Sequence, residues 1–180
     1  MLTDYIVSET EKVIKKCGSR DPFEICATLG IRVRKMDLKQ KIKGYYFYQS
    51  RIHNIVIDES LSDTFSRILV AHELGHAVLH KNLAMLKGFT ELEMPMAYEK
   101  EDSPEREANL FAAELLLDDG AVLDSLKDHT FFEAAAILNV PAALLDFKFY
   151  ILNKKGYSLS DMHIAKSTFL KELPVFDSQE

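Results

Sequence analysis

Five consecutive residues, His72-Glu73-Leu74-Gly75-His76, constrain this chain more than any other feature. If they lie in an α-helix, the two histidines share one face, because residues four apart are neighbours there. Both imidazoles can then reach one metal ion, with the Glu73 carboxylate beside them. Two histidine ligands with an internal carboxylate are typical of zinc peptidases. The motif therefore predicts His72 and His76 as metal ligands and Glu73 as the catalytic carboxylate.

The residues before this motif also favour a helix. Ser62 or Asp63 can cap its start. Residues at steps of three and four form one stripe, which consists of Phe65, Ile68, Leu69, His72, His76 and Leu79. The histidine pair thus continues a buried stripe, where ligands are rigid and shielded from water. The alternative is a pair of core histidines in a packed helix, but that alternative gives Glu73 no evident purpose.

A catalytic zinc site usually has three protein ligands and one open position, so a third ligand is needed. A second helix, predicted over residues 103–117, supplies the best candidate. Glu105 shares one face of this helix with Asn109 and with two small residues, Ala108 and Ala112. The small residues would let the two helices pack closely and would direct Glu105 at the metal. Asn109 would then hydrogen-bond a ligand from behind and orient it.

Two other candidates near these helices are less favoured. Glu107 lies on a different face from Glu105, and we interpret it as a solvated surface charge. His80 follows His76 by four residues and so suggests a site with three histidines, but in a regular helix it lies about 12 Å along the axis from His72. Zinc–nitrogen bonds are about 2 Å long, so one ion cannot hold both residues. We therefore expect His80 to be structural and to cap carbonyl groups at the helix end.

The order of the predicted elements favours an α+β fold in a single domain, residues 1–180. A helical and sheet-forming part covers about residues 1–60, the catalytic helices about 61–117, and C-terminal helices about 119–153. Three strands are predicted at Ile31–Met36, Gly44–Tyr48 and Ile52–Asp58. We expect them to form a small antiparallel sheet.

Composition narrows the class of protein further. The net charge of −6 argues against nucleic acid as the main partner, because phosphate binding needs a basic face. The sequence shows no secretion signal and no apolar run of membrane-spanning length. Cys17 and Cys26 occupy apolar helix positions and are interpreted as core residues rather than as a disulfide. Together these features predict a cytoplasmic protein.

Residues 131–145 are similar to the two-helix pattern of a helix-turn-helix unit. The second helix would carry Asp146 and Lys148 and little other charge. A DNA-reading helix needs Arg, Lys, Asn or Gln at its base-facing positions. We therefore favour an αα-hairpin that packs on the core, without direct binding to nucleic acid.

Over about residues 20–150 the chain resembles the ImmA/IrrE family of zinc metallopeptidases. The segments that carry the resemblance are DPFEICATLGIRV at 21–33, HELGHAVLH at 72–80 and EREANLFAAELLL at 105–117. The family often continues the last segment with a Met-Pro or Leu-Pro step, whereas this chain has Asp118-Asp119-Gly120. That departure concerns the end of the helix and not the metal. The length of the chain makes the ImmA-like branch the closer match.

The resemblance implies a zincin-like core of the gluzincin type with a C-terminal helical portion. It assigns His72, His76 and Glu105 as ligands of Zn²⁺, with Mn²⁺ as an alternative metal, and Glu73 as the catalytic carboxylate. Family members with known roles cleave or inactivate helix-turn-helix repressors of phages, mobile elements or stress genes. The implied function is therefore a zinc-dependent endopeptidase that cleaves such a repressor, with a protein as partner and no membrane involved.

Several alternatives stay open at this point. The protein could be an antirepressor that acts by binding alone, although structural zinc sites usually have four Cys or His ligands. Two histidines and one carboxylate also suit non-haem iron oxygenases, but these have no need of an internal glutamate. The donor that stabilises the oxyanion is unassigned among Tyr98, His129 and His163. The strand Ile52–Asp58 is the expected sheet edge to which a substrate would add.

Overall fold

The computed structural model of the chain describes residues 2–39, 42–81 and 103–160. The elements are, in chain order, α1 (Leu2–Cys17), α2 (Pro22–Leu29), β1 (Arg32–Met36), β2 (Gly44–Gln49), β3 (Ile52–Asp58), α3 (Asp63–Leu79), α5 (Pro104–Leu116), α6 (Asp119–Ser125), α7 (Phe131–Ile137) and α8 (Ala142–Lys154). The expected α+β class is confirmed, because helices pack against a small sheet formed early in the chain.

The helices that position the site begin and end at the capping signals in the sequence. The Asp21 carboxylate accepts two backbone N–H groups at the start of α2, and Gly30 ends this helix in the left-handed conformation. The Ser62 and Ser103 hydroxyls each accept a backbone N–H at the starts of α3 and α5. Both helices that carry candidate ligands therefore start where the sequence predicts.

The sheet is mixed, in the order β1-β3-β2. Strands β2 and β3 form the expected antiparallel hairpin, but β1 runs parallel to β3, so the prediction of an antiparallel sheet is wrong for β1. Strand β3 takes the centre because its apolar residues are buried on both faces, whereas β1 carries arginine and lysine and stays at the edge. Ile52–Asp58 is therefore not the edge to which a substrate strand could add, since both of its sides are paired.

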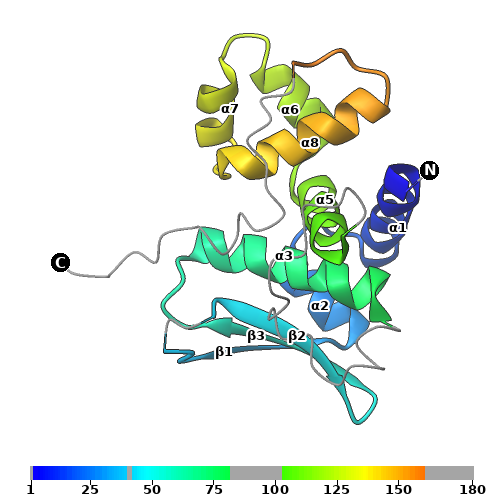
Figure 1. Cartoon of the computed structure of the whole chain (residues 1–180), viewed down its shortest axis with the longest axis vertical. Helices are drawn as coiled ribbons and strands as arrows, with labels where there is room; N and C mark the ends of the chain where they lie inside the picture. Colours follow the sequence, from blue (N-terminus) through cyan, green and yellow to red (C-terminus); the bar gives the residue numbers. More distant parts are fainter. Residues whose placement is uncertain (1, 40–41, 82–102, 161–180) are drawn as a thin grey trace, which may run out of the picture.

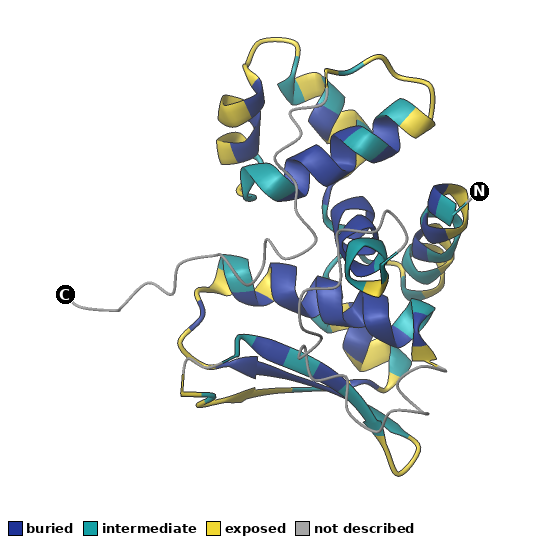
Figure 2. Ribbon diagram, in the orientation of Figure 1, coloured by how far each residue is buried: buried dark blue, intermediate teal, exposed yellow. Residues whose placement is uncertain are grey.

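The elements are stacked in layers, with α3 near the middle (Figure 1). Helix α3 crosses one face of the sheet, and α5 packs against α3 with α1 beside it. Helices α6, α7 and α8 form a group beyond α5, and α8 packs against α5. Buried residues run through β3, α3, α5 and α8 (Figure 2). The helix that carries the two histidines is thus enclosed between the sheet and α5.

Helices α7 and α8 are joined by a short turn, and the chain bends by 109° between them, an angle that also occurs in helix-turn-helix units. Helix α8 is buried over most of its length, and both Asp146 and Lys148 lie inside. A buried helix cannot read DNA in a groove, so the helix-turn-helix interpretation is not supported. Within the described ranges no single helix is long and apolar enough to cross a membrane, although the bent pair α7 and α8 passes that test by length and composition.

Both cysteines are free, as the sequence predicts. Cys26 is buried in the core, and burial raises the pKa of its thiol to about 12. A thiol with so high a pKa is not reactive near neutral pH. The role of Cys26 is therefore packing.

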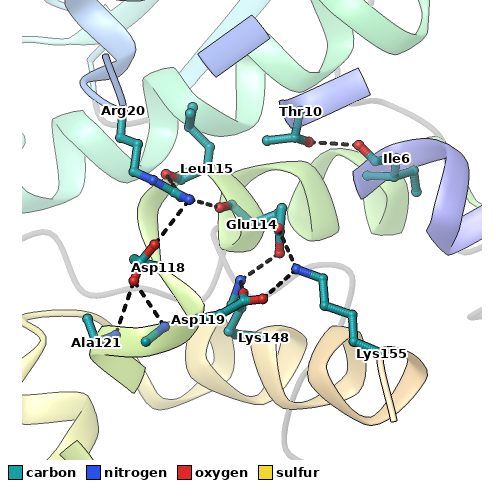
Figure 3. A network of polar contacts seen from close by, with 11 residues as sticks. Ile6, Thr10, Arg20, Glu114, Leu115, Asp118, Asp119, Ala121, Lys148 and Lys155 are labelled. Carbon is teal, nitrogen blue, oxygen red and sulfur yellow. Dashed lines mark hydrogen bonds and ion pairs between the residues drawn. The ribbon is translucent and has the colours of Figure 1, made fainter. Parts of the chain in front are cut away.

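A charged network joins the C-terminal end of α5 to the helices beyond it (Figure 3). The fully buried Lys148 of α8 binds Glu114 of α5 at 2.6 Å and Asp119 of α6 at 2.5 Å. Lys155 bridges the same two carboxylates at 2.8 and 2.7 Å. Arg20 donates to two backbone carbonyls at the end of α5. The network fixes one end of the helix whose other end carries Glu105.

Replacing Lys148 with methionine is expected to lower the free energy of unfolding by about 2–3 kcal/mol. The change leaves the buried Glu114 carboxylate without its buried partner. Because Lys155 still binds Glu114, the loss should lie at or below the about 3–5 kcal/mol typical of a broken buried pair. Urea denaturation measures the change. In the control, Lys127→Met, only the exposed pair with Asp124 is broken, and stability should hardly change; equal stabilities of the two variants would contradict the prediction.

Candidate metal centre

Helix α3 presents the two predicted histidines side by side in the interior. His72 and His76 are 2% and 6% exposed. Their Nε2 atoms lie 3.2 Å apart, as expected for residues one helical turn apart that point at a common centre. Two neutral imidazole nitrogens so close together repel through their lone pairs unless a proton or a cation lies between them. The pair therefore has the geometry of a chelate.

Glu105, in the first turn of α5, completes the group. One carboxylate oxygen lies 3.4 Å from His72 Nε2 and the other lies 3.5 Å from His76 Nε2. In the part of the chain that the structure describes, these three side chains form the group able to hold a metal ion. The structure thus brings together the three residues that the sequence nominates as ligands.

Close packing of α3 on α5 brings the carboxylate within reach. A Cβ atom on Gly75 would lie 3.1 Å from the Cα atom and 3.2 Å from the carbonyl oxygen of Ala108. The expected close contact at Ala108 is confirmed. Its partner is Gly75, a residue that sequence analysis had not connected with packing. A side chain at position 75 would push the two helices, and with them the ligands, apart.

Asn109 lies behind His72. The Nδ1 atom of His72 is 2.8 Å from the Asn109 side-chain oxygen, and both residues are buried. Because a carbonyl oxygen only accepts, His72 Nδ1 carries the hydrogen and donates it. The Nε2 lone pair of His72 then faces His76 and Glu105. This is the hydrogen bond that the sequence analysis assigns to Asn109.

The charges in the group are strongly coupled. Burial lowers the pKa of His76 to about 4, so its imidazole is neutral near pH 7. Burial alone would also lower the pKa of His72, but the hydrogen bond to Glu105 and the charges of Glu73 and Glu105 raise it. Burial alone would raise the pKa of Glu105, yet its hydrogen bonds to both histidines lower it. A positive charge is therefore favoured at the centre of the group.

Glu73 is 1% exposed, and its environment differs from that of Glu105. One carboxylate oxygen has no hydrogen-bond partner among the described residues, and the carboxylate accepts the backbone N–H of Tyr46 on β2. Burial raises the pKa of Glu73 to about 7, and the charge of Glu105 adds to this effect. A buried carboxyl with a pKa near neutrality can both take up and release a proton.

His80 and Glu107 are placed differently from what the sequence suggested. Glu107 is not a solvated surface charge, because its side chain is 18% exposed and bonds His80 Nε2 at 3.0 Å. His80 does not use its side chain to cap carbonyl groups, because its Nδ1 atom lies 3.1 Å from His76 Nδ1. As expected, His80 is not part of the metal-binding group. The spacing of His80 and Glu107 in the sequence gave no signal for a contact across two helices.

The suggested oxyanion donors are not brought to the site by the described structure. Tyr98 and His163 lie outside the described residues. His129 is exposed, and its Nδ1 atom contacts the Ser125 carbonyl at 3.0 Å, a contact local to the end of α6. The donor therefore stays unassigned.

Comparison with known proteins places the site in a wider context. A family model described as the IrrE N-terminal-like domain, Peptidase_M78, matches residues 26–150. A protein of Bacillus phage phi105 named uncharacterized immunity region protein 2 is 34% identical over 146 residues, which cover 79% of this chain and 88% of the relative. The metallopeptidase ImmA of Bacillus subtilis (strain 168) is 31% identical over 155 residues, which cover 82% of this chain and 88% of the relative.

Proposed function

Because this chain belongs to the Peptidase_M78 family of IrrE N-terminal-like metallopeptidases, as the resemblance in its sequence indicated, we propose that it is a zinc-dependent endopeptidase of the HExxH gluzincin type. We further propose that its substrate is a helix-turn-helix repressor of a phage or mobile element. The observation that carries the proposal is the convergence of His72, His76 and Glu105 from two packed helices. Family membership supports a divalent metal, and the donor set of two imidazoles and one carboxylate suits zinc.

The donor set of the three side chains suits zinc. The Nε2 atoms of His72 and His76 lie 3.2 Å apart, close to the about 3.3–3.4 Å that separates neighbouring ligand atoms when zinc bonds of about 2.0–2.1 Å meet at tetrahedral angles. One ligand atom from each of the three side chains lies within 4.8 Å of the others. Two imidazole nitrogens and a carboxylate oxygen are common zinc ligands, and Mn²⁺ is the alternative to test.

Each residue has a distinct role in the proposed reaction. His72, His76 and Glu105 bind the ion, and Asn109 holds the ring of His72 in place. When bound, zinc acts as a Lewis acid that polarises the scissile carbonyl and makes water a nucleophile near neutral pH. The unpartnered oxygen of Glu73 takes the proton of the attacking water and passes it to the leaving amine. A pKa of about 7 suits both steps.

The substrate proposal draws on the relatives and on the sheet. The phage relative is named for an immunity region, which supports a substrate that controls a phage or mobile element. Among the described strands β2 stands at one side of the sheet, and the backbone N–H of its Tyr46 contacts Glu73. An extended substrate that added to this side would pass beside the catalytic carboxylate. A repressor substrate would place the protein in the cytoplasm.

We propose that the whole chain is one metallopeptidase domain. A single apolar cluster includes residues of α1, the sheet, α3, α5 and α8, so no described element has a separate core. The C-terminal helices then support the catalytic helices rather than form an independent binding module.

The direct test is cleavage of a purified repressor. The zinc-loaded protein should cut a helix-turn-helix repressor encoded next to its gene, and mass spectrometry of the products should give one bond. A chelator should stop the reaction, and Zn²⁺ or Mn²⁺ should restore it. Inactivation of the repressor without any cut would instead support an antirepressor that acts by binding alone.

Zinc binding is expected to release a proton wherever the pH lies below the pKa of His72. Against the effect of burial, the hydrogen bond to Glu105 and the charges of Glu73 and Glu105 raise this pKa above its ordinary value, and the protonated ring must lose its proton before Nε2 can bind zinc. Zinc affinity should therefore rise with pH until His72 is fully deprotonated, above its ordinary value of 6.5. His76 is already neutral and contributes little. Calorimetry in two buffers of different ionisation enthalpy counts the protons, and an affinity that is constant with pH would contradict this assignment.

A further inference from the structure

A second set of contacts reaches away from the metal centre on the side of His76. His76 Nδ1 lies 3.1 Å from His80 Nδ1, and His80 Nε2 lies 3.0 Å from a carboxylate oxygen of Glu107. His80 is buried, and the Glu107 side chain is 18% exposed. The three side chains thus form a hydrogen-bonded series, which begins at the proposed ligand His76 on α3 and ends at the Glu107 carboxylate on α5.

The direction of the hydrogen bonds in this series is set by the His76 ring at one end and by the Glu107 carboxylate at the other. The Nε2 atom of His76 faces His72 and Glu105. When this atom binds a metal ion through its lone pair, the ring hydrogen lies on Nδ1. His76 therefore donates to His80 Nδ1. His80 then carries its own hydrogen on Nε2 and donates it to Glu107. One arrangement of hydrogens satisfies both contacts, and every ring is neutral in it.

We propose that His80 and Glu107 are positioning residues, which fix the ring and the tautomer of His76 and so increase the metal affinity of the centre. The inference rests on the proposed function, because it assumes that His76 is a ligand. Metal-binding histidines commonly donate their second ring N–H to a carboxylate or carbonyl, and loss of such a partner costs about 10–100-fold in metal affinity or activity. Here a second histidine extends the connection to the carboxylate.

The two proposed histidine ligands are thus anchored by different means. His72 donates to the neutral Asn109, whereas His76 donates through His80 to the charged Glu107. All of these partners except His80 belong to the first turns of α5, which also supplies Glu105. The negative charge of Glu107 strengthens the hydrogen bonds of the series. It thereby makes the Nε2 lone pair of His76 a stronger ligand for a cation.

The competing explanation is that His80 and Glu107 only join the ends of two helices. The backbone N–H of His80 does bond the His76 carbonyl at the end of α3. A purely structural contact would change the stability of the metal-free protein but not the affinity of the folded protein for zinc. The two explanations therefore differ in a quantity that can be measured without a substrate.

The test measures zinc dissociation constants by competition with a chromogenic chelator, with circular dichroism as the check of folding. His80→Ala and Glu107→Ala should each raise the dissociation constant about 10–100-fold. His80→Asn, whose amide oxygen stands near the position of Nδ1, and Glu107→Gln should recover part of the affinity. His129→Ala and Glu11→Gln change exposed residues elsewhere and should leave the dissociation constant unchanged.

A measurement on the wild-type protein tests the inference even if the variants fail to fold. Nitrogen-15 spectra of the imidazole rings in the zinc-loaded protein should show the hydrogen of His76 on Nδ1 and that of His80 on Nε2. The opposite tautomers, or dissociation constants of the two alanine variants within twofold of the wild type, would overturn the inference. Failure of the wild-type protein to bind zinc would instead refute the proposed function.

Discussion

Replacing Glu73 with glutamine is expected to lower the rate of repressor cleavage by about 10²–10⁴-fold while zinc stays bound. Glutamine has nearly the shape of glutamate but cannot accept the proton of the attacking water. The carboxylate is not among the three groups that converge on the proposed ion, so the metal content should be that of the wild type. Loss of the buried acid should also leave the fold intact, since burial disfavours its charged form.

The experiment compares cleavage rates, zinc content and thermal stability of the wild type and Glu73→Gln. Glu24→Gln, a change of the same kind on α2, is the matched control. A Glu73→Gln protein that cleaves at the wild-type rate would remove Glu73 from the mechanism. One that inactivates the repressor without cutting it would make binding the function.

The inactive variant also offers a test of where the substrate lies. It should hold an uncleaved repressor long enough for hydrogen exchange to be measured. Backbone amides of Gly44–Gln49 are expected to gain protection, because β2 contacts Glu73 through the backbone of Tyr46. Protection confined to other elements would contradict binding along β2.

Replacing Glu105 with alanine is expected to weaken zinc binding by more than about 100-fold, beyond the effect of any residue that only positions a ligand. The change removes one of three ligands and leaves two neighbouring imidazoles whose lone pairs repel. It also removes the hydrogen bond and one of the two charges that raise the pKa of His72, so fewer protons should be released on zinc binding. Chelator competition gives the affinity, and calorimetry counts the protons.

Glu11→Ala, on the exposed face of α1, controls for the loss of one negative charge. Glu105→Gln separates charge from ligation, since an amide oxygen is a weaker zinc ligand of similar size. If Glu105→Ala binds zinc within tenfold of the wild type, Glu105 is not the third ligand.

Local patterns explain how much of this arrangement could be predicted. The pairing of His72 with His76 depends only on the helical repeat, and the starts of α3 and α5 depend on single capping residues. Glu105 could be nominated because the alanines that follow it indicated a close helix contact. Each of these features is encoded within a few residues of the element that it forms.

The remainder depends on contacts between distant segments. Strand β3 lies at the centre of the sheet because it has the longest run of buried apolar residues, and this could be judged only by comparing the three strands. No pattern within β1 shows whether it runs parallel or antiparallel to β3. The contact of His80 with Glu107 needs the crossing geometry of α3 and α5. The packing role of Gly75 could not be predicted either, because it depends on the position of Ala108 on the facing helix.

The contact between Gly75 and Ala108 has a consequence for which ions the protein can accept. Main-chain atoms are already in close contact there, so the two helices cannot move closer together around a cation of smaller radius. The histidines are held by their outer nitrogens, which leaves rotation of the Glu105 side chain as the adjustable part. Adaptation to a smaller ion would then depend on the conformers available to a single carboxylate.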